Sequence, residues 1–93
     1  MALLSEVQIE SELERYGAWN RDGQAIVREW KFTDFAAALA FVDQVGEAAQ
    51  AADHHPDILL HGWNKVRLTL STHSQGGLTE ADFDLAGQID ELA

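Results

Sequence analysis

Apolar residues recur at helical spacing in three segments of the chain. The first segment begins at Ser5, which forms a capping-box pattern with Gln8. The last begins at Thr79, which forms the same pattern with Asp82 and precedes a run of apolar residues at helical spacing. Both segments are therefore expected to be amphipathic helices with capped N-termini.

The middle segment predicts the longest helix, from about residue 34 to residue 52. Phe35, Leu39 and Val42 share one face, which Phe41, Val45 and Ala48 widen, so this helix is expected to be the most buried. The run Asp53-His54-His55-Pro56 ends it, because proline disfavours the helical conformation in the residue before it. The two histidines are therefore expected in a loop.

Strand patterns lie between these helices. Asp22-Gly23 is a hairpin signal before the strand expected over residues 25–32. In the second hairpin, which starts near Ile58, the strand over residues 66–71 alternates apolar and polar positions, so one face is buried. The pattern predicts one α+β domain over residues 1–93, a four-stranded antiparallel sheet with three helices packed on one face, in the order α-β-β-α-β-β-α. The other sheet face must meet solvent or a partner.

Composition narrows the classes of function. The chain is 46% hydrophobic and 24% charged, as in soluble globular proteins, and no apolar run is long enough for a membrane span or a signal peptide, so a cytoplasmic location is expected. The absence of cysteine excludes disulfides, thiolate zinc sites and cysteine nucleophiles. Sixteen acidic and six scattered basic residues give a net charge of −10, so a nucleic-acid partner is not expected and a neutral ligand fits better.

Histidines are the candidates for chemistry. His54 and His55 lie in the expected loop, and His73 follows the strand over residues 66–71, so it could line a cleft at the sheet end. An imidazole titrates near pH 6.5, so one can donate a proton while another accepts one. Two other interpretations stay open: an inert surface pair, or a zinc or copper site that includes His61, although no metal-binding spacing supports the latter.

Several motifs together resemble the signature of the pterin-4a-carbinolamine dehydratases. They are Asp53-His54-His55-Pro56, Trp63-Asn64-Lys65-Val66, Leu70-Ser71-Thr72-His73, Gly77-Leu78-Thr79 and Asp82. Gly17-Ala18-Trp19-Asn20 and Phe32-Thr33-Asp34-Phe35 are also similar to family segments, so the resemblance covers nearly the whole chain. The motifs are weak one by one and highly specific in combination.

This resemblance implies a lyase that dehydrates 4a-hydroxytetrahydrobiopterin, or a related pterin, to the quinonoid dihydropterin, with no cofactor and no metal. It implies that His54 and His73 are the catalytic acid–base groups and that His55, the third histidine of the site, positions the pterin. It also implies supporting, substrate-binding roles for four further residues: Asp53, Pro56, Trp19 and Asp82. Asp82 could instead serve only as a helix cap, and Trp19 could be a core residue.

The resemblance also implies partners for the chain. It implies a homo-oligomer, dimer or tetramer, linked through tetrahydropterin recycling to an aromatic amino acid hydroxylase. At Gln50, however, the chain departs from the family's usual sequence. The family commonly has an acid three positions before the aspartate of its D-H-H-P motif, and this chain has Gln50 there, a possible modulator of the histidines. Rival functions are a non-catalytic interaction protein and a module that binds metal or stores pterin.

Overall fold

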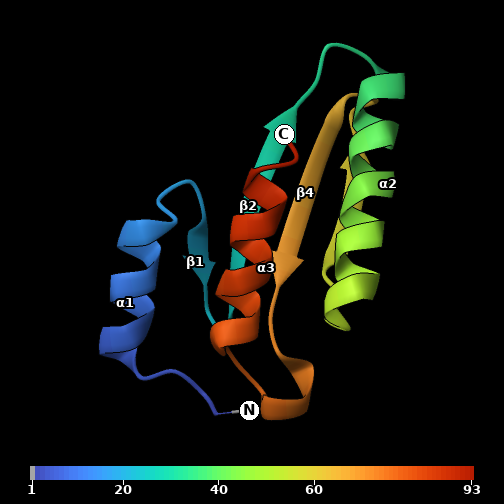
Figure 1. Cartoon of the computed structure of the whole chain (residues 1–93). Helices are drawn as coiled ribbons and strands as arrows, with labels where there is room; N and C mark the ends of the chain where they lie inside the picture. The colour runs from blue at the N-terminus through green and yellow to red at the C-terminus, as the bar shows by residue number, and fades with distance from the viewer. Residues whose placement is uncertain (1) are drawn as a thin grey trace.

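The computed structural model describes residues 2–93, and its elements follow the predicted order. The elements are α1 (Glu6–Arg15), β1 (Asn20–Asp22), β2 (Ala25–Lys31), α2 (Phe35–Ala52), β3 (Asp57–His61), β4 (Lys65–Leu70), a short 3-10 helix η1 (His73–Gln75) and α3 (Glu80–Asp90). Figure 1 shows the path of the chain through these helices and strands, with α1, α2 and α3 packed beside the sheet. The α-β-β-α-β-β-α prediction is confirmed.

The four strands form one antiparallel sheet in the order β1-β2-β4-β3. The first hairpin turns at Gly23, whose φ of 60° is easy for glycine and costly for most other residues. The second turns at Gly62 and Trp63, both with positive φ. Because β2 and β4 are the central pair, the end of β4 that leads to His73 is held by hydrogen bonds on both sides.

Both predicted capping boxes are present. Ser5 Oγ accepts a hydrogen bond from the Gln8 backbone N–H, and the Gln8 side chain accepts one from the Ser5 N–H. Thr79 and Asp82 form the second box at the start of α3. These caps satisfy backbone donors that have no partner within a helix, so they set where α1 and α3 begin.

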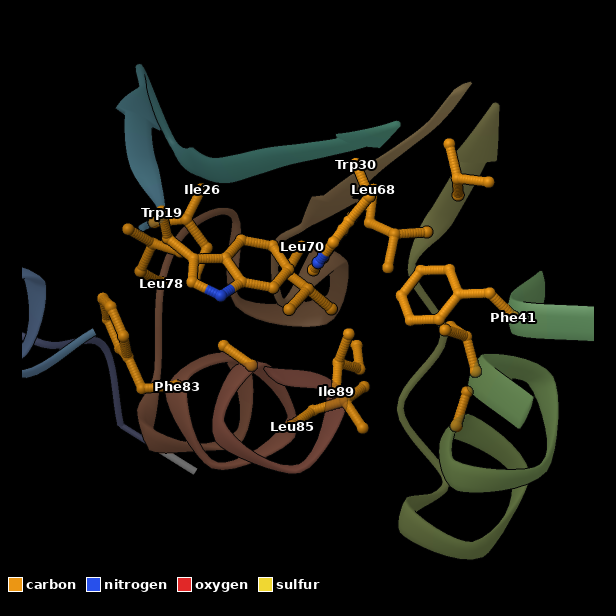
Figure 2. Close-up of a cluster of buried hydrophobic side chains, with 14 of the residues drawn as sticks. Trp19, Ile26, Trp30, Phe41, Leu68, Leu70, Leu78, Phe83, Leu85 and Ile89 are labelled. Atoms are coloured by element: carbon orange, nitrogen blue, oxygen red, sulfur yellow. The ribbon is translucent and has the colours of Figure 1, made fainter. Parts of the chain in front are cut away.

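The hydrophobic core lies between one face of the sheet and the helices. Val66, Leu68 and Leu70 alternate along β4 and are fully buried, as the pattern predicts. The helices cover this same face and add Phe41 from α2 and Leu85 from α3 (Figure 2). The opposite face of β4 carries the polar positions of the alternation, so the two faces differ as expected.

The expected buried face of α2 is only partly right. Phe35 and Leu39 are 49% and 45% exposed, whereas Phe41 and Val45, which were expected to widen the face, are buried together with Ala38 and Ala49. Helix α3 is the more buried of the two, with five of its eleven residues buried against four of eighteen in α2. Apolar residues surround much of α2, so periodicity left several faces possible, and packing brings the face with small alanines against the sheet.

No helix within residues 2–93 combines the length and the apolar character that a membrane crossing requires.

Candidate active site

The histidine pair lies where α2 ends and the chain reverses towards β3. Asp53 is the C-cap and has the left-handed conformation, with φ 50° and ψ 42°. Its N–H donates to the Gln50 carbonyl at 3.2 Å, and the His54 N–H donates to the Ala49 carbonyl at 3.1 Å. These hydrogen bonds connect the loop backbone to the last turn of α2, so the backbone of His54 is anchored to the helix.

His73 lies in a tight turn after β4. The strand ends at Leu70, and His73 begins the 3-10 helix η1, so it does not continue the strand alternation. The turn is closed by Thr72, whose N–H donates to the Gly77 carbonyl at 2.9 Å and whose carbonyl accepts from the Gly76 N–H at 3.0 Å. His73 thereby lies at the sheet end, where a cleft was expected.

The two segments meet around one pocket of about 230 Å³. Asp53, His54 and His55 line it from the loop after α2, and Ser71, Thr72, His73 and Ser74 line it from the segment after β4. The three predicted histidines therefore share a single cavity, although 17 residues lie between His55 and His73 along the chain.

Asp82 lies behind His54 and is fully buried. Its Oδ1 is 2.6 Å from His54 Nε2, and its Oδ2 accepts hydrogen bonds from Thr72 Oγ1 at 2.8 Å and from the Thr79 N–H at 2.9 Å. The capping residue of α3 is thus also the hydrogen-bond partner of a pocket histidine. The side chain of His54 is 13% exposed, so this contact is largely shielded from water.

His55 and His73 are more exposed than His54. His55 Nε2 lies 2.5 Å from Gln50 Oε1, one turn back on α2, so Gln50 contacts a pocket histidine as its position suggests. The side chain of His73 makes no hydrogen bond or ion pair to residues 2–93. His54 is thus held by the Asp82 carboxylate and His55 by the Gln50 amide, whereas the His73 side chain lines the pocket with no polar partner in the described part of the chain.

Trp19 lies away from this pocket, which corrects its expected place there. It is 2% exposed, packs edge-on against Trp30 and donates from Nε1 to Asp90 Oδ1 at 2.8 Å. Figure 2 shows it among the core side chains beneath the strands. Arg28 also binds Asp90, at 2.6 Å, so Trp19 helps to hold the C-terminal end of α3 against the sheet.

Two other predicted residues do not reach the pocket surface. Pro56 is half-buried just beyond it, where β3 begins, and Asp82 has no exposed surface. His61 lies elsewhere, on β3, with Nε2 2.6 Å from Glu29 Oε1. Within the described part of the chain, no three His, Cys, Asp or Glu side chains are grouped so that they could hold a metal ion.

The sequence reasoning missed the hydroxyl residues Ser71, Thr72 and Ser74, which line the pocket beside the histidines. Their position next to His73, just after a strand in which apolar and polar residues alternate, was the only indication in the sequence that they could line the pocket. Side-chain hydroxyls are common in surface turns, so this signal alone does not distinguish a ligand site from a turn.

A larger cavity of about 430 Å³ opens beside β1 and β2 and contains no histidine. Two of the three arginines that line it already have partners, because Arg21 binds Glu6 and Arg28 binds Asp90. The pocket with the histidines is smaller, and three imidazoles, which transfer protons readily near neutral pH, converge on it.

The chain is similar in sequence to a known family over nearly its whole length. The profile of the family described as pterin 4 alpha carbinolamine dehydratase matches residues 2–92. The chain belongs to this family. A relative from Nocardia farcinica, provisionally named pterin-4-alpha-carbinolamine dehydratase, is 54% identical over 98% of this chain and 95% of its own length. A relative from Roseiflexus castenholzii with the same provisional name is 50% identical over 98% and 97%.

Solved structures of pterin dehydratase-like proteins share the fold. A transcriptional coactivator/pterin dehydratase from Brucella melitensis superposes with a TM-score of 0.93 at 34% identity, and the match covers 99% of both chains. A pterin dehydratase-like protein identified as a RuBisCO assembly factor in the alpha-carboxysome has a TM-score of 0.70 at 26% identity, covering 82% of this chain and 89% of its own. The family name and the names of the relatives support pterin-4a-carbinolamine dehydratase activity, which is that of a hydro-lyase.

Proposed function

We propose that this chain removes water from a 4a-hydroxytetrahydropterin by histidine acid–base catalysis and releases a quinonoid dihydropterin. The observation that carries the proposal is the convergence of His54, His55 and His73 on one pocket of about 230 Å³. This volume lies below the range of about 300–1,000 Å³ that is usual for drug-sized ligands, so it suits a small ring system.

The reaction needs two proton transfers and no redox step. The C4a–O bond breaks as an acid protonates the departing hydroxyl, which leaves as water. The lone pair of the neighbouring ring nitrogen forms the new C=N bond, and a base takes the proton of that nitrogen. A positioned acid or base contributes about 10²- to 10⁴-fold to such a step.

His54 is suited to be the base. The buried Asp82 carboxylate accepts the Nε2–H of His54, so neutral His54 can take a proton at Nδ1, and the imidazolium that forms keeps its hydrogen bond to an anion. His73 lines the same pocket without a protein partner for its ring among residues 2–93, so it is suited to deliver the proton to the leaving hydroxyl. His55, held by Gln50, then positions the pterin.

Polar groups around the histidines would hold the heterocycle. Asp53, Ser71 and Ser74 line the pocket. The Asp53 carboxylate can accept from an amino group of a pterin and the Ser74 hydroxyl can donate or accept, whereas the Ser71 hydroxyl, which donates to the Gln24 carbonyl at 2.8 Å, can only accept. Pro56 follows His55 directly, and its ring restrains the backbone of the loop. Asp82 acts on the ligand only through His54. The side chain of the pterin would extend beyond this polar set.

The decisive experiment mixes the protein with a freshly generated 4a-hydroxytetrahydropterin and follows the quinonoid product by absorbance. We expect acceleration above the rate in buffer, and the same acceleration after treatment with EDTA, because proton transfer by histidine needs no metal. A rate equal to that in buffer would refute the proposed function. A rate that collapses with EDTA and returns with zinc would favour the metal interpretation.

We further propose a homo-oligomer, a tetramer, that works in tetrahydropterin recycling beside an aromatic amino acid hydroxylase in the cytoplasm. Phe35 and Leu39 leave an apolar face on α2, and Ile58 is 40% exposed on β3, whose outer edge has no strand partner within the described chain. Association would cover both the apolar face and the open edge.

Sedimentation tests the oligomer. The wild-type chain is expected to sediment as an oligomer at micromolar concentration, and Leu39→Glu is expected to shift it towards smaller species, because a carboxylate would be buried at the interface. Val7→Glu is the matched control, since Val7 is 75% exposed on α1. A wild-type monomer would contradict the proposal.

The second candidate is a non-catalytic interaction protein. It is favoured by two structural neighbours, one described as a transcriptional coactivator/pterin dehydratase and the other as a RuBisCO assembly factor. The retained set of His54, His55 and His73 around a pocket supports catalysis instead, because docking alone gives no reason for three convergent imidazoles. The turnover assay above separates the two.

A further inference from the structure

The buried hydroxyl of Thr72 connects the two histidine-bearing segments. Its Oγ1 donates to Asp82 Oδ2 at 2.8 Å and lies 2.7 Å from Thr79 Oγ1. Thr72 as a whole is 6% exposed, although it lines the pocket. None of the sequence motifs assigns it a role beyond its place before His73.

The hydrogen atoms in this network have one consistent arrangement. Thr72 has a single hydroxyl hydrogen, and the Asp82 carboxylate can only accept, so that hydrogen points to Asp82 Oδ2. The contact between the two threonines is then a bond that the Thr79 hydroxyl donates to Thr72. Asp82 Oδ2 also accepts the Thr79 backbone N–H, so this oxygen is held from two sides.

The orientation of Asp82 decides the tautomer of His54. With Oδ2 held by Thr72 and Thr79, Oδ1 is presented to His54 Nε2 at 2.6 Å. A carboxylate oxygen stabilises an N–H there and repels a lone pair, so neutral His54 carries its hydrogen on Nε2. Nδ1 has no hydrogen-bond partner among residues 2–93 and keeps a free lone pair.

The backbone of Thr72 meanwhile holds the turn that carries His73. Its carbonyl accepts from the N–H groups of Gln75 and Gly76, both at 3.0 Å, and its N–H bonds Gly77 at 2.9 Å. The main chain of Thr72 therefore stabilises the turn that carries His73, and its side chain holds the Asp82 carboxylate that contacts His54.

We infer that Thr72 is a positioning residue, which through Asp82 holds His54 in the Nε2–H tautomer and so leaves Nδ1 able to accept a proton. The inference deepens the proposed function, on which its kinetic readout rests. Its spectroscopic readout is independent of turnover.

The test compares Thr72→Val, which keeps the β-branched shape and loses the hydroxyl, with Thr72→Ser, which keeps the hydroxyl. Ring ¹⁵N–¹H correlation spectra of neutral histidine report which nitrogen carries the hydrogen, and the His54 signals are assigned by their loss in His54→Gln. Wild type and Thr72→Ser are expected to show Nε2–H for His54, and Thr72→Val a mixture of tautomers. Thr69→Val, the same change at a half-buried β4 position outside the pocket, is the control and is expected to match wild type.

In turnover, Thr72→Val is expected to lower kcat by about 10- to 100-fold, which corresponds to losing one hydrogen bond to a charged group. KM is expected to change less than about twofold, because the Thr72 hydroxyl bonds protein groups and not the ligand. Thr72→Ser should restore most of kcat.

Several results would overturn the inference. Wild-type His54 with its hydrogen on Nδ1 does so without any variant, even if Thr72→Val fails to fold. A folded Thr72→Val with unchanged tautomer and kcat does so as well, as does a defect confined to KM. If wild type shows no turnover, the proposed function fails, while the tautomers of wild type and Thr72→Val still decide the role of Thr72.

Discussion

Replacing Asp82 by asparagine removes one charge at the centre of the network and changes almost no volume. Asp82 is fully buried and accepts from three donors, namely His54 Nε2, Thr72 Oγ1 and the Thr79 N–H. Asparagine has a single acceptor oxygen, so it cannot serve both sides of this set. If its oxygen keeps the two bonds from Thr72 and Thr79, its NH₂ group faces His54 Nε2.

That arrangement reverses the tautomer of His54. Nε2 must then accept the amide hydrogen, so neutral His54 carries its own hydrogen on Nδ1 and loses the lone pair proposed to take the substrate proton. In a serine protease triad the equivalent change lowers kcat by about 10⁴-fold. For a single acid–base group we expect a loss of about 10²- to 10⁴-fold in kcat.

The same change has a limited cost in stability. Bonds to a charged acceptor become bonds to a neutral one, and we expect a loss of about 1–3 kcal/mol in the free energy of unfolding. For a chain of this size each kcal/mol shifts Tm by about 4–8 °C, so Asp82→Asn should remain folded at assay temperature if the wild-type Tm is ordinary. Thermal unfolding monitored by circular dichroism measures the shift.

Asp84→Asn is the matched control for this prediction. It makes the same chemical change two residues along α3, at an exposed position, and should leave kcat and Tm near their wild-type values. The reasoning is refuted if folded Asp82→Asn dehydrates the substrate at the wild-type rate. A folded variant that loses only substrate affinity would place Asp82 in ligand binding instead.

Three further predictions concern single side chains. Gln50→Glu should move the acidic limb of the pH–rate profile to higher pH, by about one unit or less, because a carboxylate beside His55 Nε2 favours the protonated imidazole. His73→Gln should lower kcat by about 10²- to 10⁴-fold with little change in Tm, because His73 is exposed, and His55→Gln should behave similarly. The Arg21 guanidinium lowers the pKa of Glu6 below its ordinary value of 4.5, so Glu6→Gln should reduce Tm slightly at neutral pH and not at a pH below both the folded and unfolded pKa.

Each has a control and a contradicting result. Gln44→Glu adds the same charge on α2 away from the histidines, and pH–rate profiles of Gln50→Glu and wild type that coincide would show no coupling. An active His73→Gln would remove His73 from the acid–base step. The Glu6 effect should shrink in high salt because the pair is exposed, and a Tm difference that persists at low pH would show that the ion pair is not its cause.

Local rules located most of the elements in this chain. The capping boxes at Ser5 and Thr79, the turn at Gly23 and the alternation in β4 each depend on interactions within a few residues, and all are present in the structure. The expected inner face of α2 was only partly right, because which side of a helix is buried depends on what packs against it. Apolar side chains lie on several sides of α2, so its sequence is compatible with more than one buried face. Packing in the folded chain buries Phe41 and leaves Phe35 exposed.

The sequence by itself determined the candidate chemistry, since His54, His55 and His73 stand in motifs whose combination indicates the family. Only the tertiary structure decided how these groups are connected. From the sequence, Asp82 is expected to be a helix cap and Thr72 a residue before a turn. In the folded chain Asp82 contacts His54 Nε2 and Thr72 donates to Asp82. Trp19 is buried in the core instead, where it donates to Asp90. The physical reason is that hydrogen bonds between distant segments depend on how helices and strands pack against one another, and short-range sequence patterns do not specify that packing.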